Sequence, residues 1–228
     1  MRQISLSVLV LVALVGCAPQ SAVEGPATLS SPLPSASAPS PEPTHSDPVA
    51  LRLSSSAIGA VDGSGAVVEQ VEFDRPVAEV VLLIEDVLKE SATTVQSDAS
   101  PCTDSTGITT YTWQDFAVAV YREAIPSSRA TWRGPDSYRI AFGAATINGI
   151  QLESADGIHV GDDGTEVLTA LSSGRMVQVA ESAWWALLDV GGSYANDRGT
   201  GDWGLAAIVD GGMVTSLSSP TYPLDAFC

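Results

Sequence analysis

Residues 67–90 read VVEQVEFDRPVAEVVLLIEDVLKE, and this stretch contains the pattern of a strand followed by the pattern of a helix. At the start of this stretch, side chains expected to face the core alternate with side chains expected to face solvent, as in a half-buried strand. Asp74 is the expected N-cap of the helix, with Pro76 in its first turn. From there, apolar residues at spacings of three and four indicate a helix of about 14 residues; they are Val77, Val80, Val81, Ile84, Val87 and Leu88.

The same order of patterns recurs in the second half of the chain. The matched positions are Phe73 with Val160, Glu79 with Glu166, and Trp113 with Trp203, at offsets of 87, 87 and 90 residues. We therefore expect two tandem strand-helix-strands repeats, at about residues 57–142 and 146–228. Chance similarity between two common patterns is the alternative.

The repeats predict an α+β fold. Both repeats are expected to contribute strands to a mainly antiparallel sheet, with their helices packed on one face of it. The second helix is expected to begin after Asp163 and to bury Val167, Leu168 and Leu171. Further strands are expected at residues 109–113, 116–122, 137–141, 150–152, 157–160, 176–180, 183–190, 205–209 and 213–217.

The first 16 residues have the pattern of an export signal. Residues 4–15 form an almost wholly apolar run, about 18 Å long as a helix, which is too short for a hydrocarbon core of roughly 30 Å. The run leads into Leu14-Val15-Gly16-Cys17, which resembles the lipobox of bacterial lipoproteins. The resemblance implies cleavage before Cys17 and lipid attachment to its sulfur, so the protein would be anchored at the outer face of the cell membrane. An ordinary secretory leader with an incidental cysteine is the alternative.

Residues 17–48 are expected to form the lipid anchor and a disordered tether. Positions 18–48 hold eight prolines, seven serines and five alanines but no aromatic residue. Such a stretch cannot bury enough apolar surface to offset the entropy of ordering. An extended polyproline conformation would give it a reach of roughly 95 Å. The folded domain is therefore expected at residues 49–228.

Charge and cysteine content restrict the partners and the compartment. The chain carries 27 acidic and 10 basic residues, a formal net charge of −17. This field repels nucleic acid, whereas it could concentrate cations or basic partners; plain solubility is the alternative. If lipid occupies Cys17, the two remaining cysteines, Cys102 and Cys228, are expected to form a disulfide outside the cell.

The domain offers no catalytic, metal or cofactor motif. His159 is its one histidine and lies outside any nucleophile-elbow pattern, so we expect it on the surface of a strand. Two cysteines and one histidine are too few for a structural zinc site. Asp156, Asp162, Asp163 and Glu166 suggest calcium, but their order departs from the EF-hand, and turns with a helix cap account for them. A pair of carboxylates for glycoside hydrolysis remains open, because acids are abundant.

Trp184 and Trp185 are the candidate binding surface. Neighbouring residues on a strand point to opposite faces. If helices cover one face of the sheet, one indole would be exposed on the other, where it could anchor a partner. The alternative is that a second layer covers that ring too.

Two resemblances bear on the domain. Thr146–Asp162, with Gly157-Ile158 and Val160-Gly161-Asp162, resembles uncharacterised secreted lipoproteins of high-GC Gram-positive bacteria, which often carry this turn before a helix, a Trp-led strand and a final cysteine. The tandem arrangement is also distantly similar to the β-lactamase-inhibitory protein fold, which binds enzymes across a concave sheet. This second similarity rests on architecture alone, so it transfers no residues.

These features predict a lipid-anchored, extracytoplasmic module that binds a protein, glycan or small ligand without catalysis. An enzyme inhibitor similar to the β-lactamase-inhibitory protein is one alternative. A cell-wall hydrolase with unrecognised acidic residues is the other.

Overall fold

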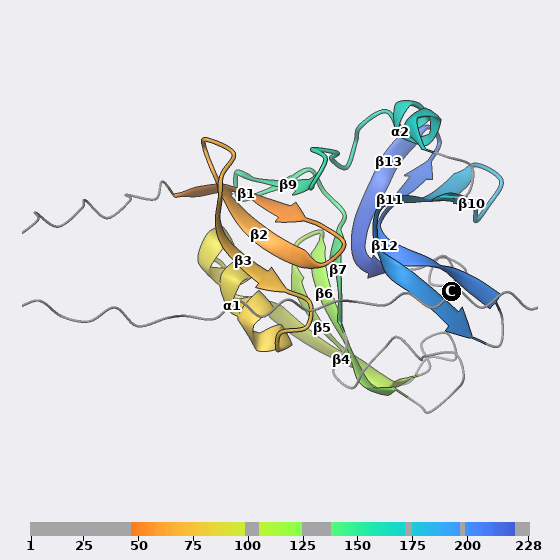
Figure 1. The fold of residues 1–228 in the computed structure, drawn as a ribbon. Helices are drawn as coiled ribbons and strands as arrows, with labels where there is room; N and C mark the ends of the chain where they lie inside the picture. Colours follow the sequence, from red (N-terminus) through yellow and green to blue (C-terminus); the bar gives the residue numbers. More distant parts are fainter. Residues whose placement is uncertain (1–46, 99–104, 125–137, 172–174, 197–198, 222–228) are drawn as a thin grey trace, which may run out of the picture. The chain divides into compact units, whose positions relative to one another are not determined.

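The structure is a computed structural model that describes residues 47–98, 105–124, 138–171, 175–196 and 199–221. All of these residues belong to one compact unit of the chain, Pro43–Cys228. They form thirteen strands and two helices, and the strands are arranged in two sheets (Figure 1). Among these residues, no helix is long and apolar enough to cross a membrane.

The larger sheet has eight strands in the order β10-β11-β12-β13-β7-β6-β5-β4, and every neighbouring pair is antiparallel. The glycine pair Gly211-Gly212 makes the tight turn between β12 and β13, with positive φ at both residues, as a two-residue hairpin requires. The strands are β4 (Thr93–Asp98), β5 (Ser105–Trp113), β6 (Phe116–Ala124), β7 (Tyr138–Phe142), β10 (Met176–Gln178), β11 (Ala183–Asn196), β12 (Gly199–Asp210) and β13 (Met213–Thr221).

The smaller sheet has five strands in the order β3-β2-β1-β9-β8. Its central pair, β1 and β9, is parallel, and its other pairs are antiparallel. Leu51 and Leu53 of β1 face the core, whereas Arg52 between them points to the other face. The strands are β1 (Pro48–Leu53), β2 (Ala57–Asp62), β3 (Val67–Glu72), β8 (Thr146–Ile147) and β9 (Ile150–Ser154).

One apolar core joins both sheets to the helix α1 (Val77–Leu88), which lies against β1, β2 and β3. Near its centre, Phe116 packs its ring against Trp113 and Phe142, with ring centroids 5.4 and 4.9 Å apart. The Trp113 indole N–H donates to the Glu90 carbonyl at 3.0 Å, so its polar atom is satisfied inside the core. The core side chains of α1 are Val80, Leu83, Ile84, Val87 and Leu88.

The second helix, α2 (Gly164–Ala170), is capped as the sequence predicts. The Asp163 carboxylate accepts from the Thr165 backbone N–H at 2.8 Å. Val167 and Leu168 are half-buried against the main core. By contrast, the predicted cap of α1 is wrong, because Pro76 occupies the N-cap position and no side chain caps that end.

The described part of the chain is mostly strand, with two helices, and is compatible with the predicted α+β class. Its strands, however, form two sheets where one was expected. The smaller sheet arises because β1 lies between β2 and β9 and pairs with both. This pairing joins the β2–β3 hairpin and the β8–β9 hairpin in one sheet, separate from the larger one. The strand predicted at residues 157–160 is also wrong. Gly157 and Gly161 turn the chain there with positive φ, and His159 makes only an isolated bridge to Glu153.

Candidate functional site

The two adjacent tryptophans of β11 point to opposite faces of the larger sheet. Trp184 is half-buried against the main core. Trp185 lies on the second face with only 3% of its surface exposed, in a small apolar cluster with Leu187 and Ala206. Val177 of β10 and Ile208 of β12 flank Trp185 on the same face of the sheet. Trp185 is therefore enclosed, and the expectation of an exposed indole on the second face is not met.

The outer face of the smaller sheet carries a charged cluster built from three elements. Arg52 of β1 and Glu153 of β9 occupy directly paired positions, so their side chains emerge side by side. The Arg52 Nε and Nη2 atoms lie 2.7 and 2.6 Å from Glu153 Oε1. Glu153 is 9% exposed and is the only charged residue among those described that is classed as buried. The arginine supplies the counter-charge that a buried carboxylate requires.

His159 lies beside this pair, between two carboxylates. Its Nε2 is 3.6 Å from Glu153 Oε2, and its Nδ1 is 3.6 Å from Asp162 Oδ2; neither distance is that of a hydrogen bond. Its backbone N–H donates to Asp162 Oδ2 at 2.7 Å, which fixes the turn. Among the described residues, no hydroxyl or thiol is hydrogen-bonded to the imidazole. In this cluster the Arg52–Glu153 ion pair links β1 to β9, and the His159 ring lies against it from the turn.

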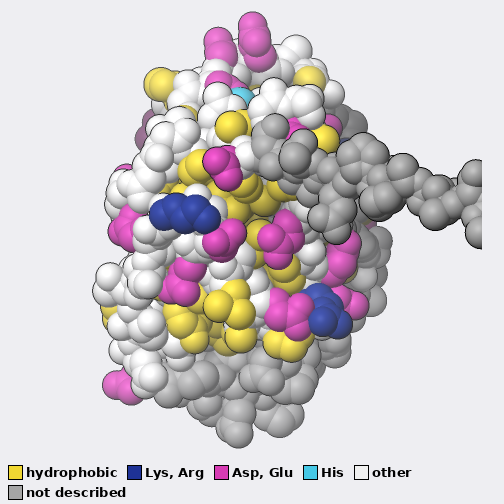
Figure 2. Space-filling view, turned by 90° about the vertical axis from the view of Figure 1, so that its left-hand side faces the viewer, with side chains coloured by type: hydrophobic (Ala, Val, Ile, Leu, Met, Phe, Trp, Pro, Cys, Tyr) yellow, Lys and Arg dark blue, Asp and Glu magenta, His cyan; other side chains and the backbone are white. Residues whose placement is uncertain are grey.

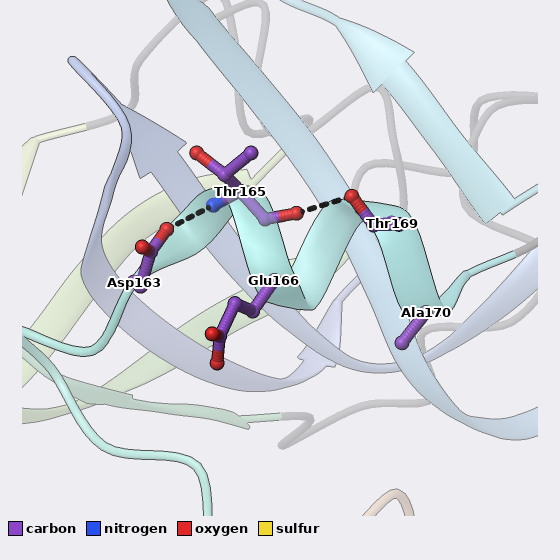
Figure 3. Close-up of a pocket in the computed structure, with 5 residues that line it drawn as sticks. All are labelled: Asp163, Thr165, Glu166, Thr169 and Ala170. Atoms are coloured by element: carbon purple, nitrogen blue, oxygen red, sulfur yellow. Dashed lines mark hydrogen bonds between the residues drawn. The ribbon is translucent and has the colours of Figure 1, made fainter.

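A shallow, open hollow of about 410 Å³ lies against α2, where Asp163, Thr165, Glu166, Thr169 and Ala170 line it (Figure 3). Two of its polar groups serve the helix itself. Asp163 caps the N-terminus, and the Thr169 hydroxyl donates to the Thr165 carbonyl at 2.7 Å. The Glu166 carboxylate accepts no hydrogen bond from the described residues. The hollow therefore offers one carboxylate to a ligand and little enclosure.

The acids that suggested calcium do not converge. In the ranges that the structure describes, no three His, Cys, Asp or Glu side chains come close enough together to hold a metal ion. The Asp162 and Asp163 carboxylates instead accept from backbone N–H groups of their own turns. The hydrogen bonds of these two residues match the turn-and-cap explanation of the sequence.

The side of the domain formed by α1 and β3 is acidic, and Figure 2 shows its carboxylates lying between apolar patches. We call this the α1/β3 surface. Its two basic side chains are already paired with acids, Arg75 with Glu79 and Lys89 with Asp86, both at 3.0 Å. Leu82 is 64% exposed in the middle of the helix. The further acids of this surface are the exposed Glu69, Glu72 and Asp74.

Three predicted site residues lie outside the described part of the chain. Cys17, the expected lipid attachment site, belongs to the first 46 residues. Cys102 and Cys228, the expected disulfide partners, lie in 99–104 and 222–228. Lipidation and the disulfide therefore stay predictions from the sequence.

Comparisons with protein-family models, with curated proteins and with solved structures give no match to this chain.

Two tertiary features were not expected from the sequence. The Asp189 carboxylate of β11 accepts from the Ser55 backbone N–H at 3.0 Å and so ties the β1–β2 turn to the larger sheet. Trp203 of β12 lies against the backbone of Gly191 and Gly192, where any added Cβ would meet its ring within 2.4 to 3.0 Å. The adjacent glycines were the available signal, because paired glycines in a strand often mark a close approach.

Proposed function

We propose that this protein is a lipid-anchored module at the outer face of the cell membrane, which binds an extracellular protein, glycan or small ligand and does not catalyse a reaction. The observation that carries the anchor is the sequence Leu14-Val15-Gly16-Cys17 directly after a short apolar leader. A Pro-rich stretch follows, as expected for a domain held away from the membrane. The charge of −17 argues against a nucleic-acid partner.

The described side chains favour binding over chemistry. The one buried carboxylate, Glu153, is engaged by Arg52, and the neighbouring His159 has no hydroxyl or thiol bonded to it in this part of the chain. The α1/β3 surface offers carboxylates around the exposed Leu82. This combination suits a basic partner with an apolar side chain at the centre of its contact, because opposite charges steer association and a central apolar contact supplies affinity.

We further propose that the domain contains two related halves, at about residues 57–142 and 146–228. The helix α1 begins at Val77 and α2 begins at Gly164, an offset of 87 residues, the same as between the matched sequence positions. Each helix is followed by four strands of the larger sheet, and their order is mirrored about the β7–β13 pair. A superposition of the two halves in an experimental structure would test this; unrelated helix positions would refute it.

An enzyme inhibitor similar to the β-lactamase-inhibitory protein is the second candidate. The eight-stranded antiparallel sheet, with four strands from each half, favours it. The cell-wall hydrolase has less support, since Arg52 already occupies the one buried carboxylate of the described residues.

The anchor is tested by metabolic labelling of the full-length protein with a palmitate analogue. We expect Cys17→Ala to lose the label, because no other thiol stands at the end of the leader. Cys102→Ala is the matched control and should keep it. Equal labelling of the Cys17→Ala variant and the wild type would refute the lipoprotein proposal.

Binding is tested with immobilised residues 43–228 and envelope extract, followed by titration of each purified candidate in solution. A partner that binds saturably, and more weakly when Leu82→Asp is introduced, would support a binding module. An unrelated domain of the same net charge controls for ion exchange. Release of soluble fragments from purified cell wall would instead support the hydrolase, and inhibition of a β-lactamase would support the inhibitor.

A further inference from the structure

We draw no further inference here: the strongest candidate, the half-buried indole of Trp203 near the far end of the β11–β12 hairpin, belongs to neither apolar cluster of the domain, and nothing in the described part of the chain shows what would cover it.

Discussion

Replacing Arg52 with methionine tests whether the buried carboxylate of Glu153 depends on its ion pair. Methionine keeps the apolar stem of arginine and removes the charge. Glu153 then retains only the His159 ring, at 3.6 Å, as a neighbour for its second oxygen. Removing one partner of a fully buried pair costs about 3 to 5 kcal/mol, whereas exposed pairs contribute about 0 to 1 kcal/mol.

The Arg52–Glu153 pair lies between these limits. The glutamate side chain is 11% exposed and the arginine side chain 29% exposed. We therefore expect Arg52→Met to lower the free energy of unfolding by about 2 kcal/mol, and the melting temperature of residues 43–228 by roughly 4 to 8 °C. Urea unfolding followed by tryptophan fluorescence measures the first quantity, and calorimetry measures the second.

A double-mutant cycle separates the ion pair from other effects of the substitution. Adding Glu153→Met to Arg52→Met should recover at least about 1 kcal/mol, because no charge is then left buried. A change below about 0.5 kcal/mol in the single variant, or no recovery in the double variant, would refute the argument that Arg52 compensates a buried charge.

Burial raises the pKa of Tyr138, with smaller contributions from nearby acids, so the phenol loses its proton more readily in the unfolded state. The free energy of unfolding, measured in urea, should therefore fall above about pH 10, and it should fall less in the Tyr138→Phe variant. Gly204→Ala should lower the free energy of unfolding by at least about 2 kcal/mol in the same assay, because the added Cβ would lie 2.0 Å from a backbone oxygen of β11. Gly63→Ala should leave this free energy nearly unchanged, because no atom lies within 4 Å of the added Cβ. Non-reducing peptide mapping should find Cys102 joined to Cys228. The first prediction would be contradicted by a steeper pH dependence in Tyr138→Phe, and the second by an equal loss of unfolding free energy in the two alanine variants. Two alkylatable thiols in the folded protein would contradict the third.

Elements with one covered face could be predicted from the sequence. The apolar spacing of three and four placed α1 correctly, because that period reports which side of a helix is covered. The Asp163 cap is equally local, since it acts within a few residues. By contrast, no alternation of apolar and polar residues predicts β4, because all six of its side chains are exposed.

By itself, the sequence determined the patterns that neighbouring residues create: the lipobox-like leader, the Pro-rich stretch, the long helix and most strands. Only the tertiary structure decided what covers each face and which distant segments pair. It brought Arg52 and Glu153 together across 101 residues, separated the strands into two sheets, and left only 3% of the surface of Trp185 exposed. The physical reason is that periodicity reports that a face is covered, whereas the identity of the cover depends on strand pairing between segments far apart in the chain.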